Sequence, residues 1–191
     1  MDISVKNLAE IIRAKFEPVS VFLYGSRART DFLKNSDYEI GVLYSRAKRI
    51  TRLDLISVNP HKNINLYPFE YEGFLDHQID SPFPEKIYLR ELIETGQTIS
   101  DEKVLEKLKP PPIKVIDLLE TARFNIAYAL AAVLSHRHGD LATAKTEFTK
   151  SCLFGIRSLI ILSLKKFPTT YQEIFTLSSS LELEGEYREI I

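Results

Sequence analysis

The chain has 191 residues, of which 45% are apolar, 10% aromatic and 27% charged. This composition is typical of a globular protein and excludes extended disorder, a collagen-like repeat and a disulfide-stapled miniprotein. With 25 basic and 26 acidic side chains the net charge is -1. Binding of nucleic acid through bulk electrostatics is therefore disfavoured, although local basic patches remain compatible with it.

The sequence predicts a cytoplasmic location. Its single cysteine, Cys152, has no partner for an internal disulfide, which is typical of a reducing compartment. The opening segment, Met1 to Ala14, mixes charged and apolar residues and lacks the apolar core of a signal peptide. No window approaches the roughly 20 apolar residues that a membrane span needs.

The first hundred residues predict a small α+β domain. Helical spacing of apolar residues predicts a helix at the start, and three short apolar runs predict strands before a second helix and a brief extended segment. The helices are expected at 3–16 and 84–95, the strands at 20–24, 38–44 and 63–69, and the extended segment at 97–100. Pro68 limits the third strand to a sheet edge or a strand end, because proline cannot donate to the ladder.

The remainder of the chain predicts an all-α domain. Three consecutive prolines, 110–112, interrupt the chain, so we expect one domain over 1–109 and a helical one over 110–191. Helices are expected at about 113–136, 141–166 and 170–177, and the two long ones form an antiparallel hairpin. The first long helix is predicted from apolar residues at steps of three or four, namely Leu119, Ala122, Ile126, Leu130 and Val133.

The second long helix is apolar on more than one side near its end. Leu153, Phe154, Ile160 and Ile161 lie outside its main stripe. Either the first domain or a second copy of the chain is expected to cover them, so a homodimer through the helical domain is one of two open interpretations.

The segment from Tyr24 to Leu43 contains the candidate site. A buried strand ends at Gly25-Ser26, and a strand-end turn of this kind offers backbone N–H groups and a hydroxyl to a phosphate. Asp37 and Glu39 are separated by one residue on a predicted strand, so they project from one face with α-carbons roughly 6 to 7 Å apart. Carboxylates so placed suit divalent cations, and Arg27 and Arg29 lie beside the turn. The pattern therefore predicts a nucleoside triphosphate bound with magnesium.

The motifs VFLYGSRAR and NSDYEI together resemble the nucleotidyltransferases of the DNA polymerase β superfamily, and most closely their minimal branch. The resemblance covers about residues 1–103 and implies a nucleotidyltransferase-type mixed sheet flanked by helices. It implies that Gly25 and Ser26 bind the triphosphate of ATP or another nucleotide while Asp37 and Glu39 coordinate magnesium. It further implies that an acceptor hydroxyl attacks the α-phosphorus and releases pyrophosphate. Arg27 or Arg29 is expected to offset further negative charge of the bound nucleotide, and the resemblance does not tell which of them. The family usually carries a small residue, often glycine, where Thr30 stands.

The resemblance also implies a third carboxylate on the neighbouring strand, where this chain has Asn65. An amide oxygen can coordinate a metal, but it carries no charge and takes no proton at neutral pH. Glu70 and Glu72, which follow Pro68, are candidates to replace it. Three interpretations stay open: an enzyme with a substitute ligand, a nucleotide- or metal-binding domain without transfer, and an enzyme that depends on a partner.

The helical domain resembles the HEPN-like domains that accompany such nucleotidyltransferases, either fused or as partners. The Arg-x(4–6)-His pair of the ribonucleases among them is absent, which implies a binding or dimerising module. The whole chain is then either an enzyme, whose acceptor is a small molecule, a protein or an RNA end, or an antitoxin-like regulatory module. The basic residues Arg46, Lys48, Arg49 and Arg52 are either a polynucleotide-binding surface or a solvated loop.

Overall fold

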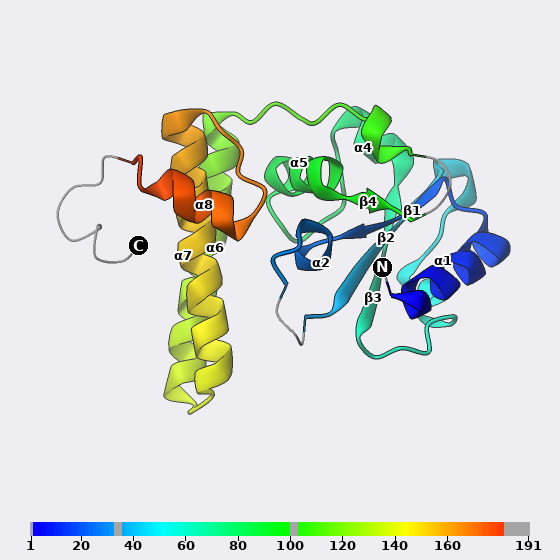
Figure 1. The fold of residues 1–191 in the computed structure, drawn as a ribbon, viewed down its shortest axis with the longest axis horizontal. Coiled ribbons are helices and arrows are strands. Elements are labelled where there is room, and N and C mark those ends of the chain that lie inside the picture. The colour runs from blue at the N-terminus through cyan, green and yellow to red at the C-terminus, as the bar shows by residue number, and fades with distance from the viewer. Residues whose placement is uncertain (1, 33–35, 100–102, 182–191) are drawn as a thin grey trace. The chain divides into compact units, whose positions relative to one another are not determined.

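The computed structural model describes residues 2–32, 36–99 and 103–181. The chain divides into two compact units, Met1–Pro112 and Ile113–Ile191, and the division lies at the end of the proline run. Unit 1 contains a mixed sheet flanked by helices and unit 2 is helical (Figure 1). The α+β fold class expected from the sequence is confirmed.

Unit 1 is built on a four-stranded sheet in the order β3-β2-β1-β4. Strand β1 (Ser20–Tyr24) lies between β2 (Tyr38–Tyr44) and β4 (Gln97–Thr98), and both neighbours are antiparallel to it. Strand β3 (Ile64–Glu70) is parallel to β2. The expected extended segment 97–100 is thus β4 over two residues, while Ser100 lies outside the described residues.

The parallel pair of β2 and β3 requires a crossover between the two strands. The 3-10 turn η1 (Arg46–Lys48) and helix α3 (Arg52–Ile56) supply it, and the apolar pattern of the sequence did not predict either of these short elements. The crossover leaves β3 at the edge of the sheet. Pro68 therefore lies within an edge strand, as expected, where its missing N–H costs no ladder hydrogen bond on the open side.

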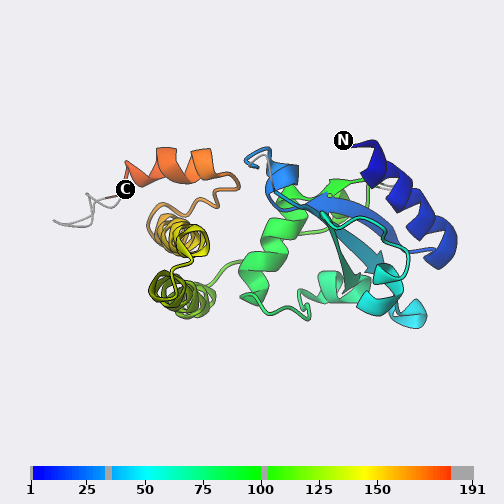
Figure 2. The same cartoon turned by 90° about the horizontal axis from the view of Figure 1, so that it is seen from below.

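Alternating side chains of β1 serve two cores on opposite faces of the sheet (Figures 1 and 2). Val21 and Leu23 pack with helix α1 (Ile3–Phe16) and with α3. Phe22 and Tyr24 pack on the other face with α4 (Tyr71–Asp76) and α5 (Glu85–Thr95). Strand β1 is buried along its whole length because helices cover both of its faces. A short helix α2 (Ser26–Arg29) follows β1, and a 3-10 turn η2 (Leu105–Lys107) follows β4.

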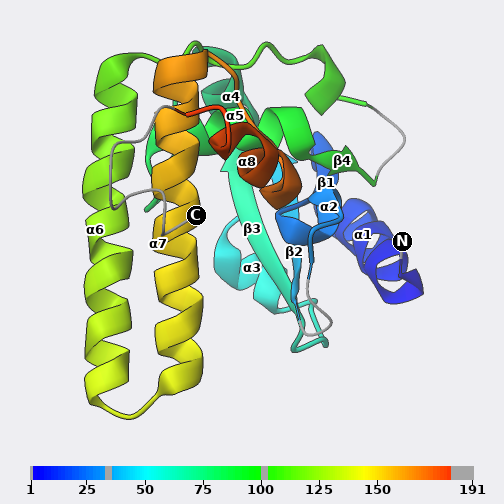
Figure 3. The same cartoon turned by 60° about the vertical axis from the view of Figure 1, so that its left-hand side comes forward.

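Unit 2 consists of α6 (Val115–Arg137), α7 (Leu141–Leu164) and α8 (Tyr171–Ser178). Helices α6 and α7 lie side by side along their length, as expected for a hairpin (Figure 3). The buried side chains of α6 are Leu118, Thr121, Asn125 and Ala132. Leu119, Ile126, Leu130 and Val133, from which the helix was predicted, are instead 49–59% exposed. No helix in the described ranges is long and apolar enough to cross a membrane.

The backbone at Thr30 is strained. Thr30 ends α2 with φ of 68° and ψ of 12°, in the left-handed region that a β-branched residue rarely adopts. The resemblance stated above carries a small residue, often glycine, at this position. The physical reason is now visible, because glycine adopts positive φ without a steric penalty.

We expect Thr30→Gly to raise the free energy of unfolding by about 0.5–1 kcal/mol in urea denaturation. The left-handed conformation costs an L-residue ~1–2 kcal/mol, and the greater chain entropy of glycine offsets ~0.5–1 kcal/mol of that gain. Thr30→Ala is the matched control: it keeps the Cβ atom and should change stability little. A loss of stability in the glycine variant would contradict this account.

Candidate active site

The register of three strands gathers the predicted site residues in one row. Tyr24 of β1 pairs with Glu39 of β2, and Glu39 pairs with Asn65 of β3. Residues paired across strands share a face of the sheet, and alternation brings Asp37, just before β2, to the same face. Asp37, Glu39 and Asn65 therefore lie together on the face that α5 also covers, beside the end of β1.

Gly25 lies against the carboxylate of Glu39. A Cβ atom at residue 25 would overlap the Glu39 carboxylate, and Gly25 has φ of 72°. The Gly25 carbonyl oxygen accepts hydrogen bonds from the backbone of Ala28 and Arg29 at 3.1 and 3.2 Å, which shapes the turn into α2. Only glycine lets the backbone of the Gly25-Ser26 turn approach the carboxylate so closely.

Asn65 occupies the place beside the two carboxylates. Its Nδ2 donates a hydrogen bond to Oδ2 of Asp37 at 3.2 Å. Asp37 is exposed, whereas Glu39 and Asn65 are half-buried. Two carboxylates and an amide form a hard oxygen donor set of the kind that Mg²⁺ prefers, so these residues fit such an ion. Over the described ranges no cluster of three or more His, Cys, Asp and Glu side chains is placed to hold a metal.

Glu70 and Glu72 are held away from this row. Glu70 lies five positions farther along β3 than Asn65, a distance of roughly 16 Å along the strand. Its Oε1 forms an ion pair with Nη2 of Arg46 at 2.6 Å. Oε2 of Glu72 accepts a hydrogen bond from the backbone N–H of Arg46 at 2.9 Å. The structure therefore brings Asn65, and neither glutamate, to the two predicted metal ligands.

Both arginines of the motif have partners within the protein. The Arg27 guanidinium donates to the carbonyl oxygen of Ser36 at 2.7 and 3.0 Å and lies over the rings of Phe32 and Tyr38, 4.3 and 4.5 Å from their centroids. It thereby fixes the residue directly before Asp37.

Arg29 forms ion pairs with Asp31 and with Glu91 of α5, and its side chain is only 9% exposed. A buried ion pair between α2 and α5 holds the turn against the helix. The partnership with Glu91 had no signal in the sequence, because 62 residues separate the two side chains.

Three tyrosines form a cluster beside this row, and the sequence analysis did not connect them. Tyr24 contacts Tyr67 and Tyr88 edge to face, with centroids 6.1 and 6.4 Å apart. Burial raises the pKa of Tyr24 well above its ordinary value, and Tyr88 and Glu39 nearby raise it further. Burial also raises the pKa of Tyr88. Alternation on two registered strands could have signalled Tyr24 and Tyr67, whereas Tyr88 comes from a helix distant in sequence.

The predicted basic run is partly neutralised. Arg46 is paired with Glu70, and Lys48 is paired with Glu17. Arg52 lies over the ring of Tyr67, 5.0 Å from its centroid.

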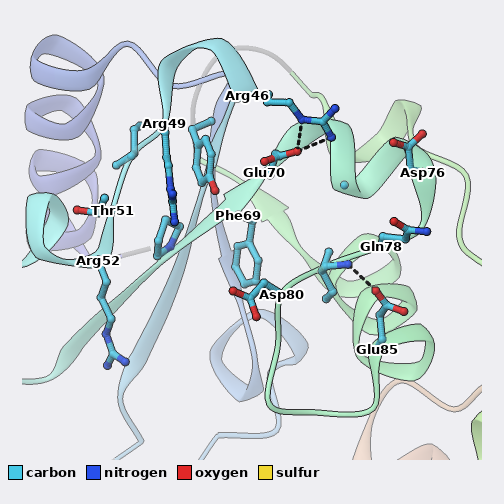
Figure 4. A pocket seen from close by; sticks show the side chains of 15 residues that line it. Arg46, Arg49, Thr51, Arg52, Phe69, Glu70, Asp76, Gln78, Asp80 and Glu85 are labelled. Atoms are coloured by element: carbon cyan, nitrogen blue, oxygen red, sulfur yellow. Dashed lines mark hydrogen bonds and ion pairs between the residues drawn. The ribbon is translucent and has the colours of Figure 1, made fainter.

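A pocket of about 640 Å³ lies at the far end of β2 and β3 from the Asp37–Glu39–Asn65 row (Figure 4). The charged side chains that line it include both signs, namely Arg46, Arg49, Arg52, Glu70, Asp76, Asp80 and Glu85. The lining of this pocket is therefore not uniformly basic.

Comparison with known proteins finds a family model that is similar to the segment carrying this site. Residues 6–79 match the family model described as "Polymerase beta, Nucleotidyltransferase". This range contains the Gly25-Ser26 turn, Asp37, Glu39 and Asn65. This part of unit 1 is thus similar to the polymerase β-type nucleotidyltransferases; the match covers less than half of the chain and does not reach α6. None of the curated proteins matches the chain.

Among the solved structures that are similar to this chain, two are described. One is spectinomycin adenyltransferase AAD(9) from Enterococcus faecialis, determined with ATP and spectinomycin; the identity is 13%, the TM-score 0.53, and the alignment covers 98% of this chain and 93% of that one. At this identity the likeness shows the fold alone. The other is a protein from Sulfolobus solfataricus described as a nucleotidyltransferase, with 24% identity, a TM-score of 0.32 and coverage of 37% and 67%.

The buried tyrosine predicts a loss of stability at alkaline pH. Tyr24 has a raised pKa in the folded state, so its stabilising effect is complete below the pKa of the unfolded chain, about 10, and is lost as the pH rises above it. The free energy of unfolding should then fall by up to about 1.4 kcal/mol per pH unit for this one group.

Urea denaturation from about pH 9 to about pH 11 tests this expectation, since most tyrosines ionise near pH 10. Tyr24→Phe should show a shallower fall than the wild type, and Tyr71→Phe, which removes a hydroxyl elsewhere in unit 1, should not. Equal slopes for all three proteins would contradict the prediction.

Proposed function

We propose that the chain is a magnesium-dependent nucleotidyltransferase that moves the nucleoside monophosphate of a bound nucleoside triphosphate to an acceptor hydroxyl. The observation that supports it is the close approach of the Gly25-Ser26 turn to Glu39, with Asp37 on the same face, inside the range that matches the family. ATP is the first nucleotide to test, because the full-length structural neighbour was determined with it. The lone Cys152 supports a reducing, cytoplasmic setting.

In this proposal each part of the row has its own role. The Gly25-Ser26 turn binds the triphosphate, and Asp37 and Glu39 hold magnesium. The ion, when bound, supplies positive charge to the phosphate oxygens. Arg27 positions Asp37 through Ser36, and Arg29 holds the turn against α5. A bond forms between the acceptor oxygen and the α-phosphorus, the bond to pyrophosphate breaks, and the acceptor proton leaves to solvent or to a base.

A second candidate function is nucleotide binding without efficient transfer, as in a regulatory, antitoxin-like module. The observation that favours it is Asn65, which donates to Asp37 where the family has a carboxylate, while Glu70 and Glu72 are engaged with Arg46. An asparagine cannot take the proton of the acceptor hydroxyl at neutral pH. In either case we propose that unit 2 is a HEPN-like module for binding or dimerisation.

We expect Asp37→Asn/Glu39→Gln to weaken ATP binding in the presence of Mg²⁺ by about tenfold or more, and to abolish pyrophosphate release. Titration calorimetry and a pyrophosphate assay measure the two effects. Spectinomycin, a tyrosine peptide and an RNA with a free 3′ hydroxyl serve as separate acceptors. Glu70→Gln/Glu72→Gln is the matched control and should preserve both binding and release. Loss of binding in the control alone would overturn the site assignment.

Asn65→Asp separates the two candidate functions. A positioned base contributes roughly 10²-fold or more to such a reaction, so restoring the carboxylate should raise the rate of pyrophosphate release by about that factor. Asn65→Ala removes the hydrogen bond to Asp37 without supplying a base and should give no increase. If Asn65→Asp releases pyrophosphate more slowly than the wild type, the reaction proceeds better with asparagine at this position. ATP binding without release in all three proteins would favour the regulatory module.

A further inference from the structure

Helix α6 carries a second apolar face that points away from α7. We call it the outer stripe and define it as Ile116, Leu119, Ile126, Leu130 and Val133. These side chains are between 49% and 59% exposed. Together with Arg123 they follow an alternating three- and four-residue spacing over the helix, which is the heptad pattern of paired helices.

The inner face of α6 is already occupied. Leu118, Thr121, Asn125 and Ala132 are buried, and Oγ of Ser151 on α7 donates to the carbonyl oxygen of Asn125 at 3.1 Å. The opposite face is exposed although it is apolar, and an apolar helix face is normally buried against another element. Helix α7 therefore does not cover the outer stripe, and another partner is needed to bury it.

The heptad spacing requires that the partner be a helix with a stripe of similar length. The stripe spans 17 steps, or roughly 26 Å. In the described part of unit 1 the longest helices have 14 and 11 residues. Its exposed large apolar side chains are spread over several elements, with at most two on any one of them: Ile3, Ile11, Phe32, Leu53, Ile56, Leu75 and Phe83. A second α6 has both the required length and the required spacing.

We propose that the outer stripe pairs antiparallel with the same stripe of a second copy, which makes the protein a homodimer through α6. Such an interface is isologous, as a two-fold axis requires. Seven apolar side chains of α6, the stripe with Val115 and Leu134, are each about half exposed. They present on the order of 700 Å² per copy, close to the ~800 Å² per partner of a standard interface.

The charges of α6 favour the antiparallel orientation. Glu120 lies in its amino-terminal half, and His136 and Arg137 lie at its carboxyl end. A register that places Ile126 on Leu130 of the second copy brings Glu120 level with His136 of that copy and one position from its Arg137. Arg123 then lies beside the stripe, where its aliphatic stem covers apolar surface and its guanidinium reaches water. The opposed helix dipoles add to the preference.

Sedimentation equilibrium and light scattering over a range of concentrations test the proposal. The wild type should be a dimer. Leu130→Glu places a charge in the interface and should raise the dimer dissociation constant at least about 100-fold. Phe148→Glu is the matched control, because Phe148 on α7 is 58% exposed but lies outside the stripe. Because these side chains are exposed on a single copy, circular dichroism should show the same helix content in both variants, whereas the melting temperature of Leu130→Glu should fall with the loss of the dimer.

A charge exchange distinguishes a second copy from any other partner. Glu120→Arg and Arg137→Glu each place like charges together in their own homodimers. In a dimer of the two different variants, both contacts between residues 120 and 137 join opposite charges. Mixed dimers should therefore make up more than the half of all dimers that random pairing gives. A wild type that is monomeric at every concentration, dissociation by Phe148→Glu rather than Leu130→Glu, or statistical mixing would overturn the proposal. The dimer should persist in Asp37→Asn/Glu39→Gln. A failure of the dimer proposal can therefore be distinguished from a failure of the proposed nucleotide site.

Discussion

The closeness of the Gly25 backbone to the Glu39 carboxylate is the constraint on which the site depends. It requires that β1 end where it does, because only the pairing of Tyr24 with Glu39 brings the turn to this carboxylate. It also requires glycine at residue 25, since any Cβ atom would overlap the carboxylate. The same register places Asn65 on the next strand. One pairing register thus fixes the distance between the turn, the carboxylates and the third position.

Interactions outside this row hold it in place. The Arg27 guanidinium lies over two aromatic rings and donates to the carbonyl oxygen of Ser36. Arg29 links the turn to Glu91 of α5 through an ion pair. Both guanidinium groups are planar and donate in fixed directions, so they constrain the loop more tightly than lysine would. The side chains that look from the sequence like phosphate ligands are thus also structural anchors. Two tyrosines, Tyr24 and Tyr88, lie close enough to Glu39 for its charge to raise their pKa values.

The two units differ in how completely they bury their apolar residues. In unit 1, helices cover both faces of the sheet and each face has its own core. In unit 2, α6 buries a face that contains Thr121 and Asn125 and leaves larger aliphatic side chains outside. This distribution is opposite to what a lone hairpin would adopt. It has a simple physical explanation if the outer stripe packs against a second α6.

The sequence by itself determined the α+β class, the strands that carry the site and the spacing of Gly25, Asp37 and Glu39, because periodicity and turn chemistry are local properties. It also predicted that Pro68 belongs at a sheet edge. Only the tertiary structure decided that Glu70 and Glu72 are engaged by Arg46, that Tyr88 and Glu91 of α5 reach the site, and that Leu119, Ile126, Leu130 and Val133 face outward. These outcomes depend on contacts between residues far apart in the chain, and periodicity cannot say which of two apolar faces a neighbouring helix will cover.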